Sequence, residues 1–402
     1  MRYFPNLIRR MLVNRNALAC AGLALAMAAC NSGTEQNDTA ATTTTAPETM
    51  ENATFYVGSY AEPDSQSIYL YSLNEQTGEL TQLSAIKAGQ NPSYLTLSNG
   101  GERMYAVNET QEYEGKQSGA VSSFEVSDDG KSLELINQVA TGGGAPCYVS
   151  VVDGTVLVAN YMGGNVAAVP VAEDGKLGQA QVVQHKGTGP NKDRQEKPHA
   201  HYIAPSPDGK YVFAVDLGAD KVFGYKLENG KLVQHQPSVA FSAAAGSGPR
   251  HLAFHPNGKY AYLVHELNST VTVLKYNPDN GTFSEEQVIT TLPADFEGDS
   301  YPAAVKVSAD GKFVYASNRG HNSIAVFSVG DEGRQLSSVQ HMSTGGNWPR
   351  DFSISPSGSI MLVANERSNQ VTVFKREKNS GKLTATAYEA QVHKPVNIVF
   401  RD

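Results

Sequence analysis

The sequence predicts an all-β fold, and three observations support this prediction. Gly is frequent, at 37 of 402 residues, whereas charged residues make up only 18% of the chain. Val, Thr, Tyr and Phe recur in short alternating runs, which is the pattern of half-buried β-strands. Asn-Gly and Asp-Gly pairs separate several of these runs and supply the positive φ angles that tight hairpin turns require. We therefore expect a series of antiparallel hairpins.

The stretch 248–273 shows the basic unit of the chain. It predicts a strand at Leu252–Phe254, a tight turn at 256–259, a second strand at Tyr260–Val264 and a third strand at Val271–Leu274. Its charged residues fall at the start of the first strand and at the end of the second strand. These two points lie at the same end of a hairpin, so the unit brings its charges together.

This unit recurs about every 50 residues, each time with a proline that opens a short apolar strand. The prolines are Pro92, Pro146, Pro198, Pro249, Pro302, Pro349 and Pro395. Four strands in a repeat of this length are typical of a β-propeller blade, and no helical periodicity favours a solenoid. The C-terminal copy supplies only a first strand, Val396–Phe400, and residues 55–86 supply only the three later strands. We therefore expect an all-β, seven-bladed β-propeller whose ring is closed by the C-terminal first strand joining three N-terminal strands.

Propeller geometry places the start of each first strand and the end of each second strand at one mouth of the central channel. The first column of residues is Ser93, His201, Arg250, Ala303 and Arg350. The second column contains Asn108-Glu109, Asn160-Tyr161, Asp216-Leu217, His265-Glu266, Asn318-Arg319 and Asn365-Glu366. A repeat needs a small polar residue to turn there, but it does not need His, Arg and Glu. Convergent charges in a concavity indicate a site, although salt bridges between blades are the structural alternative.

The N-terminal residues predict export and lipid anchoring. Arg9, Arg10 and Arg15 precede a short apolar segment that ends in Met27-Ala28-Ala29-Cys30, and this pattern resembles a bacterial lipobox. We expect a signal peptide at 1–29, lipidation at Cys30, a flexible tether at 30–53 and a propeller at 54–402. The expected location is the cell envelope, with the lipid anchor as the only membrane contact. A plain signal peptide is the alternative, whereas a membrane helix is excluded by length.

Charge and missing motifs exclude several classes of function. Removal of residues 1–29 takes four arginines and no acids, which moves the net charge from −8 to about −12 and argues against nucleic acid binding. Cys147 remains alone in the body of the chain, so no disulfide framework is expected there. Motifs for serine hydrolases, zincins and c-type haem are absent. His199 and His201 could share a strand face, but no third metal ligand is identifiable, so we expect neither a metal nor a cofactor.

Two consecutive blades carry a family resemblance. Residues 194–222 (RQEKPHAHYIAPSPDGKYVFAVDLGADKV) and 248–271 (GPRHLAFHPNGKYAYLVHELNSTV) resemble the propeller-type bacterial 6-phosphogluconolactonases. The fungal carboxymuconate cycloisomerases share part of the pattern. The resemblance covers residues 53–402 and implies lactone chemistry without a required metal. The active-site positions of the family, a histidine, two arginines and a glutamate, correspond here to His201, Arg250, Arg319 and Glu266.

These observations predict a hydrolase that opens a sugar-type lactone with activated water. We expect Glu266 or His201 to act as the general base, and Arg250 and Arg319 to stabilise the oxyanion or bind the carboxylate. We expect the other substrate contacts from Arg350, Asn318, Asn365, Glu366 and His251, and from the loop that carries Lys192, Arg194 and Lys197. The expected protein is a monomer whose partner is a small-molecule lactone. The alternatives are a non-catalytic binding propeller and a cycloisomerase. An envelope location would separate the protein from 6-phosphogluconolactone, which is a cytoplasmic intermediate.

Overall fold

The computed structural model describes residues 52–401, so the predicted signal peptide, Cys30 and most of the tether lie outside the described residues. The described residues form 28 β-strands in seven four-stranded antiparallel sheets. Two short 3-10 helices, η1 (Asp331–Gly333) and η2 (Glu366–Ser368), follow individual strands. In this part of the chain, no helix is long and apolar enough to cross a membrane.

Each sheet is one blade, and its strands follow each other from the centre of the ring outward. The blade that joins the ends of the chain consists of β28 (Pro395–Arg401), β1 (Ala53–Ser59), β2 (Ile68–Leu73) and β3 (Leu80–Ile86). The next two are β4 (Leu95–Leu97), β5 (Arg103–Asn108), β6 (Ala120–Val126) and β7 (Leu133–Ala140), then β8 (Pro146–Val152), β9 (Thr155–Asn160), β10 (Asn165–Pro170) and β11 (Gln181–Gln184). They are followed by β12 (Ala200–Pro205), β13 (Val212–Asp216), β14 (Lys221–Glu228) and β15 (Lys231–Ser242), then β16 (Pro249–Phe254), β17 (Tyr260–His265), β18 (Thr270–Asn277) and β19 (Thr282–Thr290). The last two are β20 (Tyr301–Val307), β21 (Phe313–Arg319), β22 (Ser323–Gly330) and β23 (Gln335–Ser343), then β24 (Pro349–Ile354), β25 (Ile360–Asn365), β26 (Gln370–Arg376) and β27 (Leu383–Gln391).

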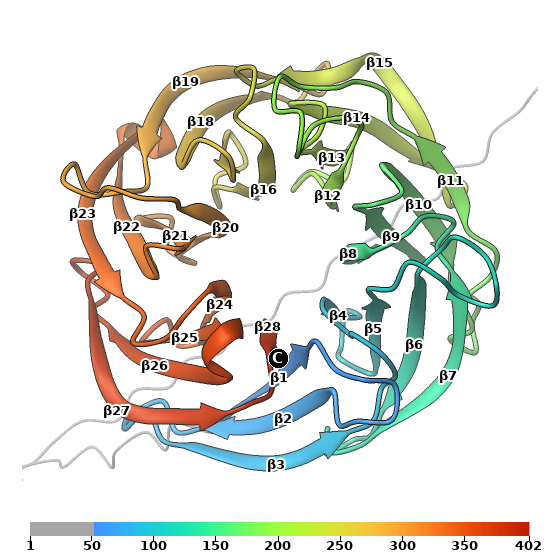
Figure 1. The fold of residues 1–402 in the computed structure, drawn as a ribbon, viewed down its shortest axis with the longest axis horizontal. Coiled ribbons are helices and arrows are strands. Elements are labelled where there is room, and N and C mark those ends of the chain that lie inside the picture. The colour runs from blue at the N-terminus through green and yellow to red at the C-terminus, as the bar shows by residue number, and fades with distance from the viewer. Residues whose placement is uncertain (1–51, 402) are drawn as a thin grey trace, which may run out of the picture. The chain divides into compact units, whose positions relative to one another are not determined.

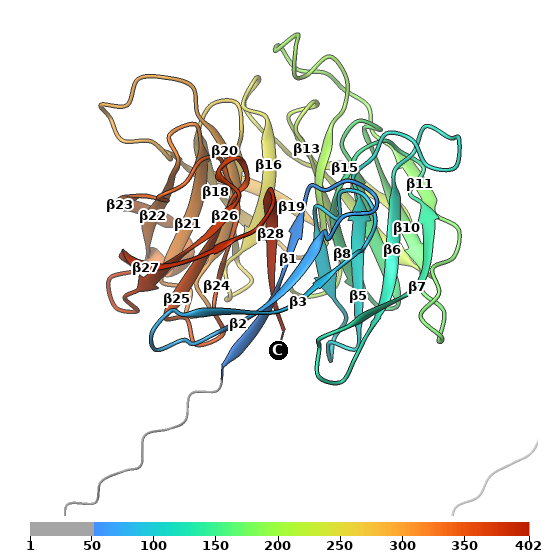
Figure 2. The same ribbon diagram turned by 60° about the horizontal axis from the view of Figure 1, so that its bottom comes forward.

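The predicted seven-bladed propeller and its closure are confirmed. The seven blades surround a channel that is lined by the first strand of each blade (Figure 1). Strand β28 pairs with β1 from Thr54 opposite Arg401 to Ser59 opposite Pro395, and the two strands lie side by side in Figure 2. This pairing joins the two ends of the propeller and removes an exposed sheet edge.

The core consists of seven apolar clusters, and the larger ones lie between neighbouring blades. Val264 and Val273 of one blade, for example, pack with Val314 and Phe327 of the next, and all four are fully buried. Buried tyrosines add a polar link between blades. The hydroxyl of Tyr262 donates to the carbonyl of Gly333 at 3.0 Å, and Tyr56 and Tyr315 make equivalent bonds to glycines of their own neighbours. The ring therefore holds each first strand in a fixed position around the channel.

Candidate active site

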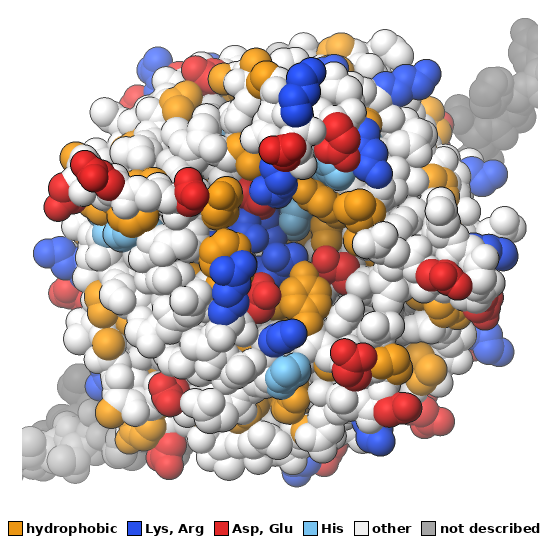
Figure 3. Space-filling view, in the orientation of Figure 1, with side chains coloured by type: hydrophobic (Ala, Val, Ile, Leu, Met, Phe, Trp, Pro, Cys, Tyr) orange, Lys and Arg blue, Asp and Glu red, His pale blue; other side chains and the backbone are white. Residues whose placement is uncertain are grey.

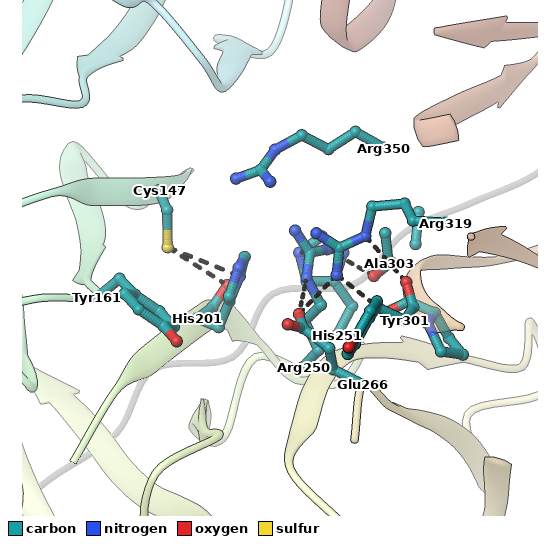
Figure 4. Close-up of polar contacts among 12 residues, drawn as sticks. Cys147, Tyr161, His201, Arg250, His251, Glu266, Tyr301, Ala303, Arg319 and Arg350 are labelled. Carbon is teal, nitrogen blue, oxygen red and sulfur yellow. Dashed lines mark hydrogen bonds and ion pairs between the residues drawn. The ribbon is translucent and has the colours of Figure 1, made fainter. Parts of the chain in front are cut away.

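Three first-column residues, His201, Arg250 and Arg350, are the extra residues of β-bulges at the starts of the innermost strands. In β16, Pro249 pairs with His265 and His251 pairs with Val264, so Arg250 has no partner in the ladder. The register skips Cys147, His201 and Arg350 in the same way. A bulge re-aims a side chain, and bulges are frequent next to active sites. Here the labelled first-column side chains point toward one another in the channel mouth (Figure 4).

The ends of the second strands supply the opposing residues, and strand alternation divides them into two groups. The amide of Asn318 donates to the carbonyl of Thr291 in the preceding blade at 2.8 Å and to the hydroxyl of Ser323 in its own blade at 3.1 Å, and the amide of Asn365 donates to the hydroxyl of Thr372 at 2.9 Å. The next residue on each strand points to the other side. Asn318 and Asn365 therefore lie outside the charged cluster, and their contacts with a substrate stay predictions.

Glu266 is the centre of an ion cluster that joins three arginines. Its Oε1 lies 2.6 Å from Nη2 of Arg194, and its Oε2 lies 3.1 Å from Nε of Arg250 and 2.7 Å from Nη2 of Arg319. Two of the guanidinium groups are also held by backbone carbonyls, since Arg250 donates to Ala303 at 2.6 Å and Arg319 donates to Tyr301 at 2.9 Å. The cluster therefore holds Arg250 and Arg319 in fixed positions, with the carboxylate of Glu266 as their shared counter-ion.

The charges in this cluster set the protonation state of its members. Burial opposes ionisation of Glu266, but Arg319, Arg250 and Arg194 outweigh it and hold the pKa of Glu266 well below its usual range. Burial and the neighbouring Arg319 and Arg350 lower the pKa of Arg250 to about 9, so this guanidinium is still charged at neutral pH. Glu266 is therefore a permanent anion and a weak base. Its geometry suits the orientation of arginines better than the removal of a proton from water.

His201 lies at the same mouth in a different electrostatic setting. Its Nδ1 is 3.6 Å from Sγ of Cys147, and its ring contacts His251 and Tyr161 edge-on with centroid distances of 5.3 and 5.5 Å. Burial, followed by the charges of Arg250 and Arg350, lowers the pKa of His201 well below its ordinary value. The imidazole is therefore neutral at physiological pH. Burial also raises the pKa of the Cys147 thiol, which argues against a thiolate nucleophile.

Arg350 occupies the opposite wall and has the fewest partners of the site arginines. Its Nη2 lies 4.0 Å from Oε1 of Glu109, and its guanidinium lies 5.3 Å from the ring of Tyr60. None of the residues from 52 to 401 accepts a hydrogen bond from it. Glu109 instead accepts bonds from Ser93 at 2.5 Å and from Tyr60 at 3.0 Å. Arg350 therefore presents its donors to the channel mouth, where it can bind an anionic group.

The remaining predicted residues also border this mouth. His251 follows Arg250 in the sequence, and its Nε2 lies 3.2 Å from Nη1 of Arg250. Its ring packs edge-on against Tyr148. Glu366 begins η2 and is close enough to raise the pKa of Arg350. Figure 3 shows the basic side chains gathered in the hollow at the centre of this face, with acidic and histidine side chains beside them. Among residues 52–401, no group of three His, Cys, Asp or Glu side chains could hold a metal ion.

Sequence reasoning overlooked two members of the site, and the repeat could have found both of them. Cys147 follows Pro146 as Arg250 follows Pro249, but the shorter turn of its blade hid the match. Glu109, which the second column already contains, follows the end of β5 as Glu266 follows the end of β17. Tyr60 has the same place after β1, which becomes visible only when the two ends of the chain are joined into one blade. Arg194, expected near the rim, contacts Glu266 directly.

The fold and the charged channel mouth define a propeller with a cluster of charged side chains at one mouth, and the comparisons with known proteins give its family. A family model described as "Lactonase, 7-bladed beta-propeller" matches residues 54–400, and the chain belongs to this family. It is 40% identical over 349 residues to the 6-phosphogluconolactonase of Bacillus subtilis, a match that covers 86% of this chain and 97% of the relative.

Solved structures lead to the same family. A structure described as the periplasmic gluconolactonase of Pseudomonas aeruginosa superposes with a TM-score of 0.81 at 35% identity, and the match covers 87% of this chain and 99% of the other. A protein from Lactobacillus plantarum superposes with a TM-score of 0.80 at 34% identity, over 88% of this chain and 100% of the other. The resemblance to 6-phosphogluconolactonases is thereby confirmed, whereas the relation to carboxymuconate cycloisomerases stays a prediction.

Proposed function

We propose that this protein hydrolyses a sugar-type lactone at the channel mouth formed by His201, Arg250, Glu266 and Arg319. The observation that carries the proposal is the ion cluster at Glu266. It fixes two charged arginines beside a neutral imidazole in a chain of a lactonase family. Opening of a lactone by water needs a group that accepts a proton from water and cations that stabilise the tetrahedral oxyanion. The site contains both kinds of group within one buried cluster.

The charges favour His201 as the general base. Both pKa values are lowered, but Glu266 is paired with three guanidinium groups, whereas the neutral imidazole of His201 has no ion-pair partner among the described residues and can accept a proton. A substrate that carries a negative charge would offset the fields of Arg250 and Arg350 and so raise the basicity of His201 when it binds. Glu266 then acts through the arginines that it orients, as a positioning residue.

Arg250 and Arg319 take the role of oxyanion donors. Both are anchored to backbone carbonyls, so their guanidinium groups need little rearrangement when charge develops on the carbonyl oxygen of the substrate. Loss of one well-placed donor of this kind costs roughly 2.7–4 kcal/mol in the activation free energy. Arg350, which faces them and has no hydrogen-bond acceptor among the described residues, binds an anionic substituent or the carboxylate of the product.

The substrate we infer is a sugar lactone that occurs outside the cytoplasm. This rests on the lipobox that ends at Cys30 and on the likeness to a structure described as a periplasmic gluconolactonase. It distinguishes the substrate from the phosphorylated lactone that names the Bacillus subtilis relative. The chemistry at the mouth suits either an aldonolactone or one that carries a carboxylate.

The experiment is a lactone panel with the Cys30→Ser protein, which leaves the propeller intact and removes the lipid site. Acid release is followed by titration at constant pH, with glucono-1,5-lactone, glucono-1,4-lactone and 6-phosphogluconolactone as substrates. We expect opening of at least one of the first two well above the spontaneous rate. If no sugar lactone is opened faster with the protein than without it, the chain is a binding propeller and this proposal is wrong.

A further inference from the structure

A single tryptophan lies at the rim of the channel mouth in a strained conformation. Trp348 is the only tryptophan of the chain, and its φ of 66° lies in the left-handed region. Non-glycine residues are uncommon in that region, and a bulky side chain there is a true outlier. Backbone strain of this kind persists at functional sites where the surrounding structure holds it.

The conformation belongs to the blade repeat, but the tryptophan does not. The residue before the strand-opening proline has a positive φ in five blades, where it is Asn91, Ala145, Gly248, Trp348 or Lys394. Glycine or asparagine would fill position 348 with less strain. The backbone around Trp348 is fixed, since its N–H donates to Asn322 at 2.8 Å and its carbonyl accepts from Glu366. The left-handed backbone at this position is therefore a feature of the repeat, whereas the indole is a feature of this blade alone.

The indole borders the proposed catalytic groups. Its ring centroid lies 5.5 Å from the guanidinium carbon of Arg319, which pairs with Glu266, and 3.4 Å from that of Arg367. Arg367 therefore stacks on the ring, and Arg319 lies within the range of a weaker cation–π contact with it. Trp348 is partly exposed, and within the described residues its indole N–H has no hydrogen-bond acceptor. Two residues further along the chain, Arg350 presents its donors to the same mouth.

We propose that Trp348 is a substrate-binding residue whose indole contacts the ring of the sugar lactone while Arg319 and Arg350 bind its oxygens. This rests on the proposed function. Aromatic side chains combine a large apolar surface with a polar N–H, which suits a ring that has C–H bonds on its faces and hydroxyls at its edge. The strained tryptophan thus selects a cyclic, hydroxylated lactone.

The sole tryptophan also provides the test, because its fluorescence reports on this position alone. The probe is the lactam of gluconic acid, a ring of the same shape that water does not readily open. We expect a saturable change in the emission of the Cys30→Ser protein as the lactam is added. An emission that stays unchanged at lactam concentrations that inhibit lactone turnover overturns the proposal.

Two variants separate binding from backbone strain. Trp348→Gly removes the indole and relieves the strain, so we expect KM for the sugar lactone to rise at least tenfold while Tm stays equal or rises. Trp348→Phe keeps a ring and should recover most of this loss. Lys394→Gly is the matched control, because its φ of 38° occupies the same repeat position, its side chain is exposed, and its backbone carbonyl, which accepts from the N–H of Tyr60, is kept in the variant. It should leave KM unchanged.

The outcomes distinguish this inference from the proposed function. If the parent protein opens sugar lactones but Trp348→Gly has an unchanged KM, the role of Trp348 is wrong and the lactonase proposal stands. If the parent opens no lactone but the lactam changes the emission, the hydrolase proposal is wrong and sugar binding at Trp348 stands. An absence of both turnover and emission change overturns both.

Discussion

Nη2 of Arg319 lies 2.7 Å from Oε2 of Glu266, and the two side chains are only 6% and 5% exposed. Arg319 ends β21 and Glu266 follows β17, so this buried pair connects two neighbouring blades at the channel mouth. The removal of one partner from a buried pair leaves an unpaired charge in a poorly solvated place. Both stability and the proposed chemistry therefore depend on this contact.

Glu266→Gln should affect activity and stability together. The amide keeps the shape of the carboxylate but leaves the guanidinium groups of Arg194, Arg250 and Arg319 without their counter-ion. We expect lactone turnover to fall at least a hundredfold, and the free energy of unfolding to fall by about 3–5 kcal/mol. The measurements are titration at constant pH and chemical denaturation. Glu332→Gln is the control, since Glu332 forms only an exposed pair with Lys259 and should change neither value by much.

His201→Gln should remove the acid limb of the pH profile. Because the pKa of His201 is lowered, the parent protein should keep its kcat/KM at pH values below 6.5, where an ordinary histidine would be protonated. The variant should lose about 10²–10⁴-fold in rate and lack the acid limb that the parent shows well below pH 6.5. If Glu266→Gln flattens the acid limb and His201→Gln does not, the base is Glu266.

Arg350→Ala should change substrate preference and leave the fold intact. Since no described residue accepts a hydrogen bond from Arg350, its removal breaks the long contact to Glu109 and the cation–π contact with Tyr60 but no hydrogen bond. A hydrogen bond to a charged group contributes roughly 1.5–3 kcal/mol, so KM for glucaro-1,4-lactone, which carries a carboxylate, should rise by about 10–150-fold. KM for the neutral glucono-1,4-lactone should change much less. Equal changes for both lactones would contradict an anion-binding role.

Stability should fall as the pH drops below about 6.5. Burial lowers the pKa of His201 and His251 well below the ordinary value and that of His265 to about 3. Below pH 6.5 the unfolded chain therefore binds protons that the folded chain does not, and each group lowers the free energy of unfolding by about 1.4 kcal/mol per pH unit until its folded pKa is reached. Glu266 adds to the loss below about pH 4.3, because its folded pKa is also lowered. Thermal unfolding between pH 4 and 8 measures the effect, and a Tm that is constant over this range would contradict it.

The repeat made most of the fold predictable. The strand-opening prolines and the Asp-Gly and Asn-Gly turns are local signals, because they fix the backbone of a few adjacent residues. The predicted turn glycines have positive φ angles, such as 69° at Gly258 and 72° at Gly311. The strand predicted at Tyr260–Val264 is observed at Tyr260–His265, and the one predicted at Val396–Phe400 is observed at Pro395–Arg401. Comparison of the copies also identified positions such as Arg250 and Glu266 that depart from the repeat.

The roles of individual site residues were less predictable. Asn318 and Arg319 are adjacent in sequence and were both expected at the substrate, but strand alternation turns the asparagine away from the ion cluster, toward Thr291 and Ser323. Cys147 and Tyr60 belong to the same two columns, but they were missed because one blade has a shorter turn and another is assembled from both ends of the chain.

The sequence by itself determined the number of blades, the closure of the ring and the end of the channel at which charged residues gather. These properties follow from local turns and from a period that can be counted along the chain. Only the tertiary structure decided which charges pair. It placed Arg194, Arg250 and Arg319 around Glu266, left His201 neutral and Arg350 without an acceptor among the described residues, and held Trp348 at the rim. The physical reason is that pKa values and ion pairs depend on distances of a few ångströms between residues from different blades, and on burial that exists only once the ring is closed.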